Sequence, residues 1–205
     1  MWMQRGYVLQ VTPSASAWER TATARIGDAI RGLRHEQGLS AQKLSERLAE
    51  LGLNISRASI SALENGSRPY VTVTEVMLFA RALNTSPITL IFPGLDYSET
   101  IEALPEVQRT QRDAAAWFCT ATVLMADPGF TDDPKLYRSN TRLLGLSRHQ
   151  AELRYQVSMA DSELAIVNSD DVNQIKALTL LRERGAKALA EVEIRLQTEL
   201  ERRGG

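Results

Sequence analysis

Apolar side chains in the first half of the chain recur every three or four residues, which is the spacing of amphipathic helices. We expect a first helix over residues 21–37 and two shorter helices over 42–51 and 56–65. A serine begins or precedes each short run, and its oxygen can accept a hydrogen bond from the free amides of a first helical turn. Gly52 and Gly66 follow the two runs and suit the left-handed turn that ends a helix. The pattern therefore predicts two short, capped helices after a longer one.

Two further helices complete this segment. Thr72 and Glu75 have the spacing of a capping box, in which each side chain satisfies the other's backbone amide, so a helix is expected over residues 73–83. Pro87 stands at the first position of a fifth helix, where proline is tolerated. Five short helices are the content of a small all-helical domain, and the pattern predicts one over residues 21–94.

The segments on either side of this domain are less regular. Residues 1–20 are predicted to be a leader, in which alternating apolar residues over 7–11 are compatible with a short strand that ends at Pro13. Residues 95–112 are polar and interrupted by Pro105, so a linker is expected there.

The C-terminal part, residues 113–205, has the spacing of long helices. A mostly apolar helix is expected over 113–125, and two long apolar stripes follow, separated by the polar residues 168–171. Such a pair of stripes predicts a helical hairpin. Gly185 interrupts the second stripe, where it either allows a close helix crossing or weakens the helix. The fold class expected for the whole chain is all-α, with a five-helix domain followed by a helical C-terminal oligomerisation or regulatory domain.

Charge is unevenly distributed along the chain. Residues 20–70 carry eight Lys or Arg residues against five acidic ones, whereas residues 71–205 carry 15 basic and 19 acidic residues. Two short capped helices beside a basic helix are the arrangement of a helix-turn-helix reader of DNA. A basic segment joined to an acidic remainder favours DNA contact through the first segment, because phosphates repel the remainder.

Two stretches carry a specific family likeness. The sequences LSAQKLS (39–45) and ISRASISALENGSRP (55–69) resemble the Cro/C1-type (XRE) helix-turn-helix family of phage and bacterial regulators, above all those of actinobacteria and their phages. The resemblance covers about residues 24–93. It implies a five-helix domain, a recognition helix near 56–65, and dimeric binding to an inverted repeat.

The start of a recognition helix points into the major groove, and side chains one turn later reach the next bases. The predicted DNA-binding residues of this helix are Ser56, Arg57, Ala58, Ser59, Ser61 and Ala62. Arg57 alone offers two parallel donors that match guanine O6 and N7, and a phosphate contact is its alternative role. Alanine methyls can pack on thymine methyls. With one strong reader per half-site, specificity needs two half-sites or shape readout.

The resemblance also implies roles for residues outside this helix. Contacts to the DNA backbone are expected just past the recognition helix and at the start of the second helix, at Asn65, Ser67, Arg68 and Lys43. The family's glutamine that contacts bases at the start of the second helix falls on Ala41, and Gln42, which stands one place later, is the predicted contact there. Arg34 and Glu64 are implied to form a structural ion pair rather than to read bases. The connection from Leu48 to Ile55 is longer than in the phage repressors, so the second helix is expected to gain a turn.

Several function classes find no support in the sequence. The two histidines, His35 and His149, lie in separate helices with no cysteine or second histidine nearby, so no zinc signature exists. Neither a glycine-rich phosphate loop nor a Ser nucleophile elbow occurs, and we expect no enzyme, metal or cofactor. Cys119 is the single cysteine, which excludes an internal disulfide and fits a reducing cytoplasm. No apolar run approaches the roughly 20 residues of a membrane span.

The function expected from these observations is transcriptional regulation in the cytoplasm. The protein would bind a double-stranded DNA operator, form a homodimer through its C-terminal helices, and act as a repressor that occludes a promoter, with phage immunity as one context. A monomer that reads an asymmetric site, with further DNA contacts from the C-terminal half, is a variant of this hypothesis. Two alternatives stay open. One is an antitoxin or other regulator controlled by a protein partner; the other is a ligand-sensing regulator in which Trp117, Phe118 and the helices after residue 140 enclose a small molecule.

Overall fold

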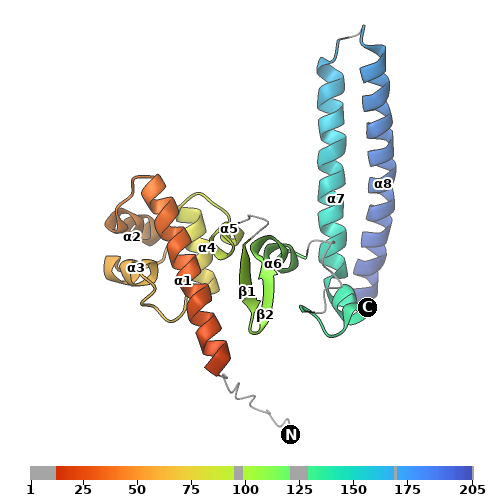
Figure 1. The fold of residues 1–205 in the computed structure, drawn as a ribbon. Helices are drawn as coiled ribbons and strands as arrows, with labels where there is room; N and C mark the ends of the chain where they lie inside the picture. The colour runs from red at the N-terminus through yellow and green to blue at the C-terminus, as the bar shows by residue number, and fades with distance from the viewer. Residues whose placement is uncertain (1–12, 95–98, 121–128, 169, 205) are drawn as a thin grey trace. The chain divides into compact units, whose positions relative to one another are not determined.

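The chain forms two compact units, Met1–Phe118 and Cys119–Gly205, which we call the N-terminal unit and the C-terminal unit. The computed structural model describes residues 13–94, 99–120, 129–168 and 170–204. These residues are mostly helical (Figure 1), which confirms the main point of the all-α prediction. A two-stranded antiparallel sheet in the N-terminal unit is the exception among them.

Five helices form most of the N-terminal unit (Figure 1). They are α1 (Pro13–Glu36), α2 (Ala41–Glu50), α3 (Arg57–Glu64), α4 (Val73–Ala82) and α5 (Pro87–Ile91). α1 begins well before the predicted start at residue 21, so part of the predicted leader 1–20 is helical. Pro13 suits the first helical position, because its φ is already helical and an amide there would have no partner. The strand predicted over 7–11 lies outside the described residues.

Local caps fix where these helices begin and end. Ser40 caps α2, Ser56 caps α3, and Thr72 with Glu75 forms the capping box of α4. Each of the helices α1 to α4 ends in the same way. Two crossed backbone hydrogen bonds close the last turn around a residue with positive φ. These residues are Gly38, Gly52, Gly66 and Asn84. Because all these signals lie close together in the sequence, the observed bounds of α2, α3 and α4 agree with the predicted ones to within a residue.

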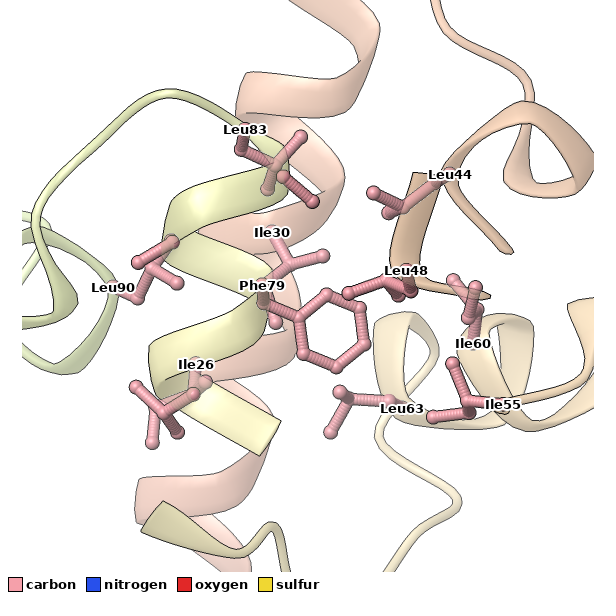
Figure 2. Close-up of a cluster of buried hydrophobic side chains, with 13 residues drawn as sticks. Ile26, Ile30, Leu44, Leu48, Ile55, Ile60, Leu63, Phe79, Leu83 and Leu90 are labelled. Atoms are coloured by element: carbon pink, nitrogen blue, oxygen red, sulfur yellow. The ribbon is translucent and has the colours of Figure 1, made fainter. Parts of the chain in front are cut away.

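The core of the N-terminal unit lies between the five helices (Figure 2). Phe79 of α4 points into its middle, between Ile30 of α1, Leu48 of α2 and Leu63 of α3. All four side chains are fully buried, and full burial of a large apolar side chain contributes about 1.5–3 kcal/mol. Since α3 supplies part of this core, its position is tied to that of the other helices.

α1 and α3 approach each other closely at Gly27. A Cβ atom at this position would lie 2.1 Å from the carbonyl oxygen of Leu63 in α3. That distance is far inside van der Waals contact, and the obstacle is backbone, which cannot rotate away. The missing side chain of Gly27 therefore allows the contact that sets the separation of the two helices.

A buried ion pair joins the same two helices at their other point of contact. Arg34 of α1 donates from Nε to Oε1 of Glu64 at 2.6 Å and from Nη2 to Oε2 at 2.7 Å, and its Nη1 donates to the Leu39 carbonyl at 2.6 Å. Both side chains are buried. The hydrogen bonds with Glu64 raise the pKa of Arg34, so the guanidinium stays charged. A bidentate pair fixes orientation as well as distance.

Of the residues predicted to be a linker, 100–112 form a β-hairpin and the start of a short helix instead, and 95–98 lie outside the described residues. These elements are β1 (Thr100–Leu104), β2 (Val107–Thr110) and α6 (Gln111–Phe118). Pro105 and Glu106 form the turn, and Glu106 has a φ of 67°, as a proline followed by a positive-φ residue favours. The indole of Trp18 in α1 donates to the Glu102 carbonyl at 3.0 Å, so the hairpin packs on the helical domain. Of the helix predicted over 113–125, residues 121–125 lie outside the described part.

The C-terminal unit contains an antiparallel pair of long helices (Figure 1). They are α7 (Pro134–Ile166) and α8 (Val172–Gly204). The apolar side chains buried between them are Leu153, Ala160, Leu178 and Val192. A Cβ atom at Gly185 would lie 2.9 Å from Cγ2 of Val157, so this glycine allows a close crossing, the first of its two predicted roles. None of the described helices is long and apolar enough to cross a membrane.

The contact at Gly27 predicts the effect of a single added methyl group. Gly27→Ala should lower the free energy of unfolding of the N-terminal unit by about 1–3 kcal/mol or more, because α1 and α3 must separate. Gly32→Ala in the same helix is the control, since a Cβ there meets nothing within 4 Å; it should raise stability by roughly 0.5–1 kcal/mol. Urea unfolding followed by tryptophan fluorescence measures both, because all three tryptophans lie in the N-terminal unit. Equal stabilisation by the two changes would contradict the close contact.

The buried ion pair predicts a strongly non-additive pair of substitutions. Arg34→Met or Glu64→Leu alone should each cost about 3–5 kcal/mol, because the remaining charge is buried without its partner. The double variant should recover much of that loss, since two apolar side chains then meet. Arg31→Met is the control: Arg31 pairs with Asp28, but both side chains are at least half exposed, so the loss should stay below about 1 kcal/mol. Additive losses in urea unfolding would show that the two side chains do not act as a pair.

Candidate nucleic-acid interface

The connection between α2 and α3 is long but firmly held. The Leu53 amide donates to the Leu48 carbonyl at 2.8 Å, which closes the end of α2. Ser45 Oγ donates to the Ile55 carbonyl at 2.6 Å, and the Ile55 side chain is buried. The loop is therefore tied to α2 at both ends, and its length does not loosen the angle between the two helices.

α3 presents one face to the core and the other to the outside. Ile60 and Leu63 are fully buried, whereas Arg57 and Ala58 in the first turn are exposed. The half-buried residues of the helix are Ser59, Ser61 and Ala62. The residues predicted to read DNA thus lie on the outward face and the first turn, and the residues predicted to be core lie on the inward face.

Of the charged side chains on α3, Arg57 is the one that can bind a ligand. α3 carries two charged side chains, Arg57 and Glu64, and Glu64 is engaged by Arg34. Arg57 is exposed and makes no ion pair or side-chain hydrogen bond with any residue that the structure describes. All its donors are therefore free for a ligand that accepts two parallel hydrogen bonds, either a guanine edge or a phosphate.

The hydroxyl and amide groups at the two ends of α3 take part in local hydrogen bonds. Ser56 Oγ accepts from the Ser59 amide at 3.1 Å and lies 3.0 Å from Ser59 Oγ. Asn65 Oδ1 accepts from the Ser67 amide at 3.0 Å and from its hydroxyl at 2.5 Å. The side-chain NH₂ of the exposed Asn65 is left to donate outward. These residues therefore shape the helix ends, and Asn65 keeps a donor beside the surface of α3.

The start of α2 exposes the second predicted group of contacts. Lys43 Nζ lies 3.0 Å from Glu46 Oε2, and Gln42 Nε2 donates to Glu46 Oε1 at 3.1 Å. Hydrogen bonds from Gln42 first and from Lys43 second lower the pKa of Glu46. Exposed pairs of this kind contribute little to stability, so Gln42 and Lys43 can exchange Glu46 for a phosphate at small cost.

Arg68 is placed differently from what the resemblance implies. Its Nη2 donates to both carboxylate oxygens of Glu75, at 3.0 and 3.2 Å, and its side chain is 19% exposed. Burial raises the pKa of Glu75, but hydrogen bonds from Thr72 and Arg68 outweigh this and lower it. Arg68 Nη1 is buried without a hydrogen bond to any described residue. Arg68 thus holds the loop after α3 against the start of α4, and a phosphate contact would require it to leave Glu75.

Three residues that position the interface were not singled out in the sequence. Gly27 allows the contact with α3, and its one sequence signal is a glycine inside a helical pattern. Arg47 of α2 donates from Nη1 to the Ala82 carbonyl at 3.3 Å, while Gln37 donates to the Leu83 carbonyl at 2.7 Å. Both bonds hold the end of α4, and no local pattern predicts bonds between such distant residues.

Residues 25–90 match the family model of a helix-turn-helix domain. Comparison with curated proteins gives no match, and neither does comparison with solved structures. The matched residues run from α1 to α5, so they include the whole surface formed by α2 and α3. The chain therefore carries a helix-turn-helix domain, and such a domain indicates a DNA-binding regulator of transcription.

Proposed function

We propose that the protein is a sequence-specific transcriptional repressor that binds a double-stranded DNA operator through α2 and α3. The observation that carries the proposal is Arg57, an exposed side chain without an ion-pair partner among the described residues, on the first turn of a helix whose other face is locked in the core. Repression by occlusion requires only that the operator is occupied. Activation would also require a contact with polymerase. A phage immunity repressor is one context that fits.

Recognition would begin with α3 entering the major groove by its first turn. Arg57 would donate two hydrogen bonds to guanine, and the methyl groups of Ala58 and Ala62 would pack on thymine methyls. Lys43 and the free amides at the start of α2 would contact phosphates and so fix the register on the duplex. The rigid attachment of α3 to α1 keeps Arg57 in place for this contact.

One strong reader per half-site favours a homodimer on an inverted repeat, and α7 offers a surface for it. Five large apolar side chains of this helix are exposed, and apart from Leu136 they share one side: Leu144, Tyr155, Met159 and Ile166. At 3.6 residues per turn they fall on the side opposite to Leu153 and Ala160, which face α8. An apolar face of this kind is stabilised when a second copy covers it.

A randomised duplex pool tests the proposal with the full-length protein. The pool retained by the wild type should contain two guanine-bearing half-sites in an inverted repeat. Arg57→Gln should weaken operator binding by roughly 5- to 150-fold for each half-site and relax the preference at one base pair in each, because each subunit loses one bidentate contact. Arg81→Gln is the control, since Arg81 is an exposed residue of α4 and the charge change is the same. Fluorescence anisotropy on the selected operator gives the affinities.

Three other outcomes of this experiment would change the interpretation of Arg57 or of the whole proposal. An equal loss on every sequence would assign Arg57 to a phosphate instead of a base. A single asymmetric motif in the retained pool would indicate a monomer on DNA. No enrichment by the wild type would overturn the proposal.

A cavity in the N-terminal unit favours a second candidate function, a repressor that responds to a small apolar molecule. The cavity measures about 580 Å³, a size typical of ligand sites, and its walls are almost entirely apolar. Trp18, Phe92, Trp117 and Phe118 supply aromatic surface, and Arg25 is the one charged residue of the lining. The walls belong to the N-terminal unit alone, whereas the ligand-sensing hypothesis from the sequence also used helices after residue 140.

A fluorescent probe tests this cavity. Anilinonaphthalene sulfonate should bind the full-length protein with enhanced fluorescence and change its affinity for the operator. Ala22→Phe should abolish most of that binding, because Ala22 lines the cavity and the ring would fill it. Ala186→Phe makes the same change at an exposed position of α8 and should leave binding intact. Equal probe binding by both variants would show that the probe does not occupy the cavity.

A further inference from the structure

The start of α7 and the end of α8 lie at the same end of the C-terminal hairpin (Figure 1). Side chains from both helix ends line an open groove there. It measures about 840 Å³. Four permanently charged side chains line it: Lys135, Arg138 and Arg142 of α7, and Arg202 of α8. His149 continues the row, and no acidic side chain is part of the lining. The groove therefore presents an excess of positive charge.

The arginines at this groove are held in place by one buried carboxylate. Glu199 is 2% exposed and accepts hydrogen bonds from Arg202 at 2.6 Å and Arg203 at 2.8 Å, and Nε of Arg142 lies 3.5 Å from it. Hydrogen bonds from Arg202 and then Arg203 lower the pKa of Glu199 to about 2. One negative charge is thus shared by three guanidinium groups, which leaves an ordered surplus of two positive charges.

The remaining cations are not neutralised by their neighbours. Lys135 and Arg138 are exposed and make no ion pair with any described residue. Of the carboxylates that adjoin this region in the sequence, Asp132 is exposed, Asp133 accepts hydrogen bonds from the first amides of α7, and Glu201 accepts one from Gln197. None of these three carboxylates forms an ion pair with a cation of the groove among the described residues, so those cations stay available.

The cations form a row rather than a single point. Lys135, Arg138 and Arg142 recur at helical spacing on one side of α7, and His149 lies further along the same side. The row of three cations is about 10 Å long at 1.5 Å of rise per residue. Phosphates of one DNA strand are spaced about 3.4 Å along the duplex axis, so the row can meet several of them. A single inorganic phosphate would meet only part of it.

The charge on the hairpin is also polarised along its length. Residues 134–151 carry four Lys or Arg and no Asp or Glu, and residues 189–204 of α8 at the same end carry three basic and four acidic residues; residues 152–188, toward the opposite end, carry five basic and six acidic residues. A polyanion is attracted to the open end and repelled from the closed end. The polarity therefore defines which end of the hairpin faces a phosphate backbone.

We infer that this basic groove binds the sugar-phosphate backbone of the DNA that α3 reads. The inference rests on the proposed function and adds a second, sequence-independent contact to it. The groove supplies affinity through phosphates, while α3 supplies the choice of sequence.

The salt dependence of binding by the full-length protein tests the inference. Each neutralised phosphate contributes about 0.9 to the slope of log Kobs against log salt concentration. Lys135→Gln/Arg138→Gln should make this slope shallower by about 2 for each subunit bound and weaken operator and random duplexes by the same factor. Arg184→Gln/Lys187→Gln, two exposed cations of α8 about 22 Å or more from Arg202, is the matched control and should change neither.

The alternatives give different results. An unchanged slope for Lys135→Gln/Arg138→Gln, with Arg57→Gln still impairing operator binding, would overturn the inference and leave the proposed function standing. Thermal stabilisation by inorganic phosphate that the groove variant loses, with an unchanged slope, would assign the groove to a small anion. A changed oligomeric mass in sedimentation would assign it to a contact between subunits. Absence of DNA binding by the wild type would remove the proposed function itself.

Discussion

The contact between α1 and α3 is the constraint on which the DNA-facing surface depends. At Gly27 the two helices touch without an intervening side chain, and at Arg34 a bidentate ion pair fixes Glu64, the last residue of α3. A carboxylate at the C-terminus of a helix is unfavourable beside the negative end of the helix dipole. Arg34 offsets this cost, so the pair both orients α3 and makes its C-terminal acidic residue acceptable. The direction of the recognition helix is thus set by α1 rather than by the loop that precedes it.

α1 also makes hydrogen bonds to several other parts of the N-terminal unit. Its Trp18 bonds to the hairpin, its Arg25 donates to the Ile91 carbonyl, and its Gln37 donates to the Leu83 carbonyl after α4. The apolar cavity lies against the first half of this helix, which carries Trp18, Arg25 and Ile26 into its wall. A molecule in the cavity would therefore press on the same helix that positions α3. Such an arrangement gives a small ligand a direct mechanical route to the DNA-facing surface.

The parts of the fold that the sequence predicts are those with local causes. Ser40, Ser56 and the Thr72–Glu75 box mark helix starts through hydrogen bonds that span three residues, and those helices were predicted closely. The β-hairpin was missed because its support comes from Trp18, far away in the chain. The candidate interface shows the same difference between local and long-range causes. The outward position of Arg57 follows from helical periodicity, whereas the engagement of Arg68 by Glu75 depends on how the loop after α3 packs on α4.

The inference at the basic groove departs from what net charge predicts, for a reason of scale. The acidic total of residues 71–205 suggested that phosphates avoid the C-terminal half. Charges in salt solution act over about 10 Å, however, while a helix of 33 residues is about 50 Å long. The acidic residues at the closed end of the hairpin are therefore screened from the basic groove at its open end. What a phosphate meets is the local arrangement around Glu199, where three arginines share one carboxylate, and that arrangement is positive whatever the sign of the whole unit.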